Sequence, residues 1–317
     1  MLPREVIRRV REIQIRTGRQ VADVLAGQYV SAFKGRGIEF DEVRPYLPGD
    51  DVRTIDWNVT ARVGEPFVKR YVEDRQLNLM VMADVSASQD FGTGQRSKRE
   101  ATAELSALLA FSATRHDDKI GLALFHSEIE QYIPARKGHR HSLRVIREVL
   151  AHGNVESQPA KRTSRWLPLG QRRSWWRTGR QSTSIAGAME FLMSVTSRKM
   201  ICFVISDFLD EGFIGAMRSA HRKHDVIAVL VSDPKELQLP DVGLVNLQDP
   251  ETGRVQQYDT GSAAFRSQVE SAAHDRVAEL ERLFGSSGID FIHIDSQADV
   301  VDPLVRFFRM RTRRLKR

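Results

Sequence analysis

The stretch Met80-Val81-Met82-Ala83-Asp84-Val85-Ser86-Ala87-Ser88 joins an apolar strand to a cluster of oxygen donors. A short, uninterrupted apolar run indicates a buried β-strand, and this one ends in the pattern Asp-x-Ser-x-Ser. One carboxylate and two hydroxyl groups are hard oxygen ligands of the kind that Mg2+ and Mn2+ prefer. Because ligands of open α/β sheets bind outside the carboxyl ends of the strands, the stretch predicts a divalent ion and its position.

The chain on both sides of this stretch alternates apolar runs with helical patterns. We expect strands at 77–84, 119–125, 129–133, 200–206, 225–231 and 289–294. We expect helices at about 97–115, 141–151, 184–197, 211–223, 262–284 and 299–312. This alternation predicts a doubly wound α/β fold with a mostly parallel sheet and helices on both faces. The two strands nearest 126–128 are too close for a parallel crossover, so one of them should be an antiparallel edge strand.

The pattern also divides the chain into two domains. Residues 1–76 should form an N-terminal helix, with helical spacing over 3–26, and a lobe that is rich in arginine, aspartate and turn residues. We expect no regular element within the lobe. Residues 77–317 should form the α/β domain, with insertions at about 152–182 and 244–258. The second insertion contains a Pro-Glu-Thr-Gly turn between two extended arms, which predicts a β-hairpin.

The composition narrows the class of protein. Hydrophobic residues make up 41% of the chain and charged residues 28%, which is typical of a globular protein. No apolar run is long enough to span a membrane, and the N-terminus lacks the pattern of a secretory signal, so we expect a cytoplasmic protein. Cys202 is the single cysteine, so no internal disulfide can form. No phosphate-binding or dinucleotide-binding glycine motif is present, which leaves nucleotide binding without support.

An ion that takes six oxygen ligands needs more donors than Asp84, Ser86 and Ser88 supply. Two other segments offer them at the ends of predicted elements. Asp207 follows the strand at 200–206, and Thr183 lies between two serines just before the helix at 184–197. An alternative interpretation is that Ser86 and Ser88 simply cap the helix that follows their strand.

Together these three segments resemble the von Willebrand factor A domain with its metal-ion-dependent adhesion site. In that family the first loop reads Asp-x-Ser-x-Ser, the second supplies a threonine and the third an aspartate. The resemblance therefore implies an ion held by Asp84, Ser86, Ser88, Thr183 and Asp207. The family leaves one coordination position for an acidic side chain of a partner, which implies an ion-mediated bridge between proteins.

Two departures from the family pattern affect the second and third loops. Phe208 stands where the third loop commonly has glycine, so the local turn could differ. Arg180 and Gln181 stand where glycines often precede the threonine, so Ser182 or Ser184 could replace Thr183 as a ligand.

The lobe carries a second resemblance. The run from Gly35 to Trp57, continued by Asn58, Ala61-Arg62 and Lys69-Arg70, is similar to the signature of the bacterial domain-of-unknown-function 58 family. That resemblance covers about residues 20–315. It implies a MoxR-type AAA+ ATPase as partner and a chaperone-like role in assembling or activating other complexes.

The charges of this signature alternate along the lobe. Because arginine suits bidentate pairing with carboxylates, we expect ion pairs that pin the lobe onto the sheet domain. A docking surface for a partner is the alternative.

Together with the oxygen-rich loops, the two resemblances imply a non-enzymatic adaptor with a protein-binding site that depends on Mg2+ or Mn2+. Its partners would be a MoxR-type AAA+ ATPase and a client that offers an acidic side chain. A metal-dependent hydrolase at the same carboxylates would need a general base, and none is indicated.

The alternative function is a nucleic-acid-binding module that uses the basic segment 136–180 and the C-terminal tail. Over 136–180, twelve Lys/Arg stand against two acidic residues, and seven of the last twelve residues are basic. A solvated surface is the other interpretation of such clusters.

Overall fold

The computed structural model describes residues 8, 12, 29, 32, 33, 38–73, 76–152, 183–248 and 254–315. Most of the predicted N-terminal helix and nearly all of the insertion at 152–182 lie outside these residues. Among the described helices, none is both long and apolar enough to cross a membrane.

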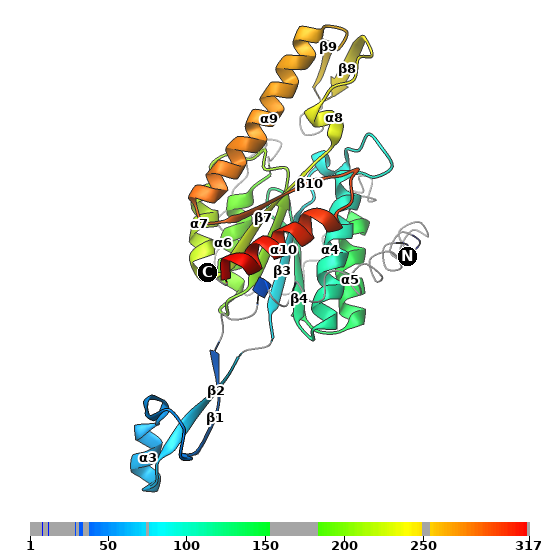
Figure 1. Cartoon of the computed structure of the whole chain (residues 1–317). Coiled ribbons are helices and arrows are strands. Elements are labelled where there is room, and N and C mark those ends of the chain that lie inside the picture. The colour runs from blue at the N-terminus through cyan, green and yellow to red at the C-terminus, as the bar shows by residue number, and fades with distance from the viewer. Residues whose placement is uncertain are drawn as a thin grey trace, which may run out of the picture.

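A six-stranded sheet forms the centre of the α/β domain (Figure 1). Its order is β10-β7-β6-β3-β4-β5. The strands are β3 (Asn78–Asp84), β4 (Lys119–Phe125), β5 (Ile129–Arg136), β6 (Ile201–Ser206), β7 (Asp225–Ser232) and β10 (Asp290–Asp295). All neighbours pair in parallel except β5, which is antiparallel to β4 at the edge. The predicted fold class and the antiparallel edge strand are therefore confirmed.

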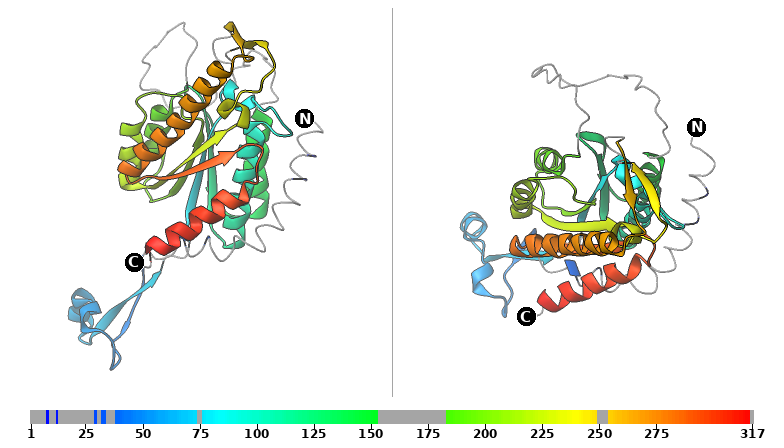
Figure 2. Two further views of the ribbon diagram at one scale, coloured as in Figure 1. Left: turned by 45° about the horizontal axis from the view of Figure 1, so that its top comes forward. Right: turned by 90° about the horizontal axis from the view of Figure 1, so that it is seen from above.

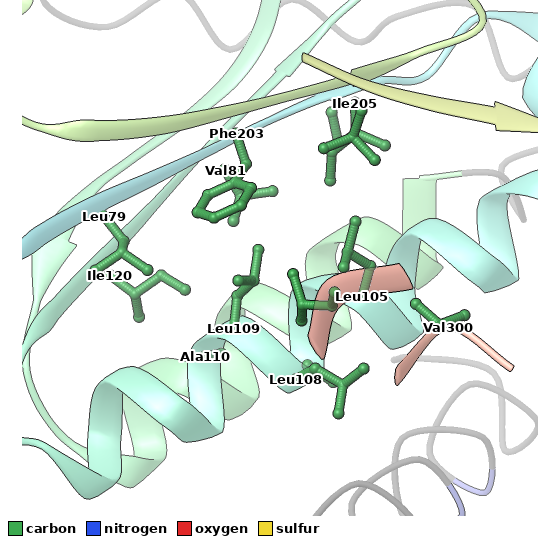
Figure 3. Close-up of a cluster of buried hydrophobic side chains, with 14 of the residues drawn as sticks. Leu79, Val81, Leu105, Leu108, Leu109, Ala110, Ile120, Phe203, Ile205 and Val300 are labelled. Carbon is green, nitrogen blue, oxygen red and sulfur yellow. The ribbon is translucent and has the colours of Figure 1, made fainter. Parts of the chain in front are cut away.

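Helices cover both faces of this sheet. They are α4 (Lys98–Arg115), α5 (His139–Ala151), α6 (Ile185–Val195), α7 (Ile214–Lys223), α9 (Ala263–Ser286) and α10 (Val301–Leu315). Successive side chains of a strand point to opposite faces of the sheet, so β3 contributes to a hydrophobic core on each face. Leu79, Val81 and Ala83 pack with α4, α5 and α10, in the cluster of Figure 3. Met80 and Met82 pack on the other face with α6, α7 and α9.

The N-terminal lobe has more regular structure than its sequence predicted. Strand β1 (Ile38–Pro45) pairs antiparallel with β2 (Phe67–Glu73), and helix α3 (Trp57–Val63) lies between them in sequence. A 3-10 helix (Val52–Thr54) precedes α3. The expectation of no regular element was wrong, because the two strands pair across a long gap that no local pattern reveals. Asp56 caps α3 by accepting hydrogen bonds from two backbone amides, and Gly64 ends it with a left-handed φ of 84°.

Two ion pairs of the described residues lie within the lobe. Arg44 pairs with Asp50 at 2.7 Å, and Lys69 with Asp56 at 3.4 Å. These two pairs stabilise the lobe's own turns, so among the described residues they do not supply the predicted ion pairs with the sheet domain. Figures 1 and 2 show the lobe projecting away from the sheet.

The predicted hairpin at 244–258 is present. Strands β8 (Leu244–Gln248) and β9 (Val255–Asp259) pair antiparallel, and the turn between them lies outside the described residues. The short helix α8 (Pro234–Leu237) precedes the hairpin and α9 follows it. We call α8, the hairpin and α9 the arm. Its hairpin and the start of α9 extend past the carboxyl ends of the strands (Figures 1 and 2).

A buried arginine fastens α10 to the sheet. Arg311 is 5% exposed and pairs with Asp225 at the start of β7 and, at 3.2 Å, with Asp290 at the start of β10. Its guanidinium also lies over the ring of Phe33, 4.8 Å from the ring centre. Removal of this cation would leave a buried carboxylate without its partner.

We expect Arg311→Met to lower the free energy of unfolding by about 3–5 kcal/mol, the cost of breaking a buried ion pair from one side. Arg314→Met is the matched control, because Arg314 pairs with the same Asp290 from a side chain that is 64% exposed. The control should cost less than about 1 kcal/mol. Urea denaturation measures both values, and equal losses would contradict this role of Arg311.

Candidate metal centre

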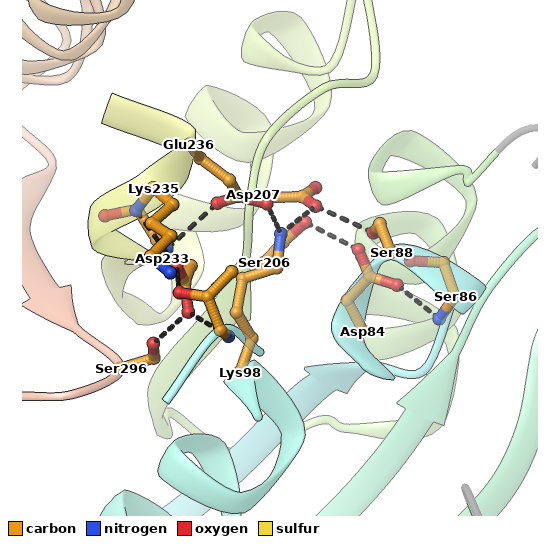
Figure 4. Close-up of polar contacts among 12 residues, drawn as sticks. Asp84, Ser86, Ser88, Lys98, Ser206, Asp207, Asp233, Lys235, Glu236 and Ser296 are labelled. Carbon is orange, nitrogen blue, oxygen red and sulfur yellow. Dashed lines mark hydrogen bonds and ion pairs between the residues drawn. The ribbon is translucent and has the colours of Figure 1, made fainter. Parts of the chain in front are cut away.

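The first loop brings three predicted ligands together. Asp84 is the last residue of β3, and its Oδ1 accepts a hydrogen bond from the amide of Ser86 at 2.9 Å. The hydroxyls of Ser86 and Ser88 lie 3.0 Å apart. All three residues are buried. Figure 4 shows them facing the loop that follows β6.

The third loop completes this cluster because β6 lies next to β3 in the sheet. Asp207 directly follows β6, and its Oδ2 accepts a hydrogen bond from Ser88 at 2.7 Å. Ser206 donates to Oδ2 of Asp84 at 2.7 Å. The structure thus places Asp84, Ser86, Ser88 and Asp207 in one hydrogen-bonded cluster, as predicted. Ser206, the last residue of β6, is an additional member that was not among the predicted ligands.

The serines of the first loop do not act as helix caps. A short 3-10 helix (Ala87–Asp90) follows Ser86, whose side chain makes no capping hydrogen bond to it. Helix α4 is capped by Ser97 instead, in a capping box with Glu100. The alternative interpretation of Ser86 and Ser88 as caps is therefore wrong.

Thr183 differs from the other predicted ligands in its described hydrogen bond, which lies outside the cluster. It lies just before α6, 8% exposed, with its hydroxyl 3.2 Å from Nδ1 of His126. Ser184 caps α6 by accepting from the amide of Gly187. Ser182 lies outside the described residues. In the described part of the chain, the second loop therefore contacts the end of β4 through His126 instead of hydrogen-bonding to the cluster.

Phe208 adopts the backbone conformation that the family's glycine would favour. Its φ is 52°, in the left-handed region, which costs a bulky residue free energy. Two contacts offset the strain. Its amide donates to Ser206 Oγ at 3.1 Å, and its buried ring packs edge-to-face on Phe284 with centres 5.1 Å apart. The turn of the third loop is thus left-handed without a glycine.

The two carboxylates of the cluster have different electrostatic partners. Burial raises the pKa of the Asp84 carboxyl above its usual value, and the nearby charge of Asp207 raises it further. Hydrogen bonds from Ser86 and Ser206 oppose this rise but do not cancel it. Asp207, by contrast, has a cation beside it, because Lys98 Nζ donates to its Oδ2 at 3.1 Å.

Lys98 also belongs to the site, although it was not among the predicted site residues. It is 1% exposed and also pairs with Glu236 of α8 at 2.7 Å. Burial alone would lower the pKa of its ammonium group, but Asp207 and Glu236 outweigh burial and raise that pKa. One signal was available, since Lys98 stands in the first turn of a helix, where the helix dipole disfavours a cation. Its position there indicates carboxylate partners elsewhere in the fold.

The donor set fits a hard divalent ion. Two carboxylates and the hydroxyls of three serines (Ser86, Ser88 and Ser206) converge, all of them oxygen ligands suited to Mg2+ or Mn2+. Within the described residues, no group of three His, Cys, Asp or Glu side chains could hold a metal ion, so an ion here depends on the hydroxyls. The hydrogen bonds that Asp84 accepts come from neutral donors. A buried carboxylate of this kind favours a bound cation.

The two aspartates should respond oppositely to neutralisation. Because the pKa of Asp84 is higher in the fold than in the unfolded chain, its contribution to stability is complete below the unfolded value and is lost as pH rises through the folded value. Ionised Asp84 therefore destabilises the ion-free protein at pH 7. We expect Asp84→Asn to raise the free energy of unfolding in EDTA by roughly 0.5–2 kcal/mol, the usual range of a stabilising substitution.

Asp207→Asn is the matched comparison, and it should lower the free energy of unfolding by about 1–3 kcal/mol because buried Lys98 loses a charged partner. Urea denaturation at pH 7 measures both variants. The gain from Asp84→Asn should shrink as the pH falls toward 3.8, the ordinary pKa of an aspartate. Destabilisation by both substitutions would show that Asp84 is not under electrostatic stress.

Comparison with known proteins finds uncharacterised relatives and distant structures. A protein of Mycobacterium tuberculosis (strain ATCC 25618 / H37Rv), "Uncharacterized protein Rv1480", is 30% identical over 305 residues, covering 96% of this chain and 89% of the relative. "Uncharacterized protein MAV169" of Mycobacterium avium is 32% identical over 133 residues, covering 41% of this chain and 76% of the relative.

Two solved structures have low similarity to the chain. The conserved hypothetical protein BatB from Bacteroides thetaiotaomicron has a TM-score of 0.44 at 14% identity, covering 75% of this chain and 99% of BatB. The SpRpn10 VWA domain has a TM-score of 0.37 at 11% identity, covering 72% of this chain and 94% of that domain.

A family model identifies the chain more directly. The family described as "Protein of unknown function DUF58" matches residues 42–279, which include most of the lobe and the cluster around Asp84 and Asp207. This match covers well over half of the chain and agrees with the signature in the lobe. The protein therefore belongs to the DUF58 family.

Proposed function

We propose that this protein is a non-enzymatic adaptor that binds partner proteins through a divalent ion, Mg2+ or Mn2+. The observation that carries the proposal is the burial of Asp84, with neutral hydrogen-bond donors, beside Asp207 and three serine hydroxyls at the carboxyl ends of β3 and β6. Such a cluster is built to hold positive charge.

The aspartates and serines of the cluster would contribute differently to ion binding. Asp84 and Asp207 would supply negative charge, and Ser86 and Ser88 would supply hydroxyl oxygens whose positions their hydrogen bonds already hold. A bound ion would supply a positive charge with a coordination position open to a partner's carboxylate. The partner would therefore offer an aspartate or glutamate side chain at the centre of its binding surface.

A MoxR-type AAA+ ATPase is the proposed working partner. Membership of the DUF58 family supports this assignment through the resemblance of the lobe. The ATPase would supply energy, and this chain would recognise a client complex during its assembly or activation. Because the ATPase consumes ATP, the proposal places the pair in the cytoplasm.

Asp84→Ala tests the proposal. It should weaken Mg2+ binding at least tenfold, an effect of about 1.4 kcal/mol, and should reduce capture of the ATPase and client to the level seen with EDTA. Glu211→Ala is the control, since Glu211 is an exposed acid near the same end of the sheet. Calorimetry with Mg2+ and co-purification measure the two effects. Partner capture that persists unchanged in EDTA would refute the proposal.

One observation favours a second function, the binding of nucleic acid. Four arginines of α10 (Arg306, Arg309, Arg313 and Arg314) line a surface hollow of about 380 Å³ together with Met310. Arg306, Arg309 and Arg313 are spaced three and four residues apart, which places them along one side of the helix, and Arg314 adjoins Arg313. Such a basic surface would attract phosphate groups. Most of the other basic segment, 136–180, lies outside the described residues.

Replacement of Arg309 and Arg313 by glutamine tests this second function. The double variant should weaken binding to duplex DNA or RNA and reduce the slope of log affinity against log salt by about two, one for each lost arginine. Arg218→Gln with Arg222→Gln on α7 is the charge-matched control. A salt titration that gives equal slopes for both variants would exclude α10 as the binding surface.

A further inference from the structure

Lys98 links the metal cluster to the arm. It stands in the first turn of α4, and its ammonium group lies between Asp207 of the cluster and Glu236 of α8 (Figure 4). A buried ammonium requires such partners, because an unpaired charge cannot stay in the interior. Lys98 therefore connects the cluster, through Asp207, with the arm, through Glu236.

The contact with Asp207 involves an oxygen that the cluster also uses. Oδ2 of Asp207 accepts both from Lys98 Nζ, at 3.1 Å, and from Ser88 Oγ, at 2.7 Å. The side of the carboxylate that faces the first loop is thus already in contact with a cation. A divalent ion held by Ser88 and Asp207 would lie close to the ammonium and would repel it strongly in this buried setting.

The contact with Glu236 reaches the helix cap of α8. Glu236 Oε1 accepts from Lys98, while its Oε2 accepts from the amide of Asp233 in the capping box that begins α8. A change in the partner of Glu236 would therefore act on the start of this short helix, from which the hairpin follows.

The arm also contacts Asp207 through α9. Arg276 donates from its guanidinium to the backbone carbonyl of Asp207. Asp207 is thus held by α4 at its side chain and by α9 at its backbone. A shift of Asp207 would therefore disturb α8, through Lys98 and Glu236, and α9, through Arg276.

We propose that Lys98 is an internal counter-ion that competes with the divalent ion for Asp207, and that its displacement by the ion is transmitted through Glu236 to the arm. This inference rests on the proposed metal site and adds a mechanism by which Lys98 regulates ion binding there. Without the ion, Lys98 neutralises Asp207 and holds α8 against the cluster. With the ion, Lys98 loses Asp207, and the contact between α4 and α8 is weakened.

Titration with Mg2+ in a calorimeter tests the competition. Lys98→Met removes the charge from a side chain of similar length, and we expect it to bind Mg2+ at least about tenfold more tightly than the wild type, because the repelling charge is gone. Lys98→Gln, which keeps a hydrogen-bond donor, should behave likewise and serves if Lys98→Met does not fold. Lys235→Met removes one charge from an exposed position of α8 and should leave the affinity unchanged.

Hydrogen exchange measures the effect on the arm. Mg2+ should speed amide exchange in α8 of the wild type, whereas in Lys98→Met this exchange should be fast without the ion and insensitive to it. Equal exchange of α8 in ion-free wild type and ion-free Lys98→Met would overturn the link to the arm. Equal or weaker Mg2+ affinity in both Lys98 variants would overturn the competition.

The results that would refute this inference differ from those that would refute the proposed function. If the wild type binds no Mg2+ but the Lys98 variants do, the competition is upheld and the metal-dependent function fails. If Mg2+ binds as expected but EDTA does not reduce partner capture, the proposed metal-dependent function is refuted, whereas the competition between Lys98 and the ion is supported. If neither the wild type nor the Lys98 variants bind Mg2+, the inference itself is wrong.

Discussion

Two carboxylates, Asp84 and Asp207, are buried next to each other at the carboxyl ends of adjacent strands, and the surrounding structure is arranged around their charge. Such a pair is unfavourable without compensation, because burial and mutual repulsion both oppose ionisation. The chain compensates them unequally, since Asp207 has Lys98 and Asp84 has only neutral donors. The remaining imbalance would favour a bound cation, and this is the basis of the proposed function.

The sheet domain supplies the rigidity that such a cluster needs. Strands β3 and β6 are buried almost throughout, and two cores on opposite faces fix their register. Polar groups at the ends of these strands are therefore held in place by packing that involves no ligand. Phe208 illustrates the same principle, because its ring is anchored among Phe213 and Phe284 and holds a strained turn beside Asp207.

The appended parts differ in how they relate to this rigid centre. The β1–β2 lobe, which carries the family's charged signature, stabilises itself through its own ion pairs and projects away from the sheet (Figure 1). The arm touches the cluster directly through Arg276, and indirectly through Glu236, which pairs with Lys98. A partner bound at the cluster would thus meet the arm, whereas the lobe presents a separate surface. This division suits an adaptor that engages two proteins, as the proposed function requires.

The amino-acid sequence alone determined the alternation of strands and helices, the antiparallel edge and the Asp-x-Ser-x-Ser loop, because these depend on apolar periodicity and on residues close together in the chain. It also indicated Asp207, since a carboxylate after a buried strand must lie at the sheet's edge. Only the tertiary structure decided the pairing of β1 with β2, the hydrogen bond between Thr183 and His126, and the ion pairs of Lys98. Lys98 is 109 positions from Asp207 and 138 from Glu236, and no local pattern reports a contact made across such distances.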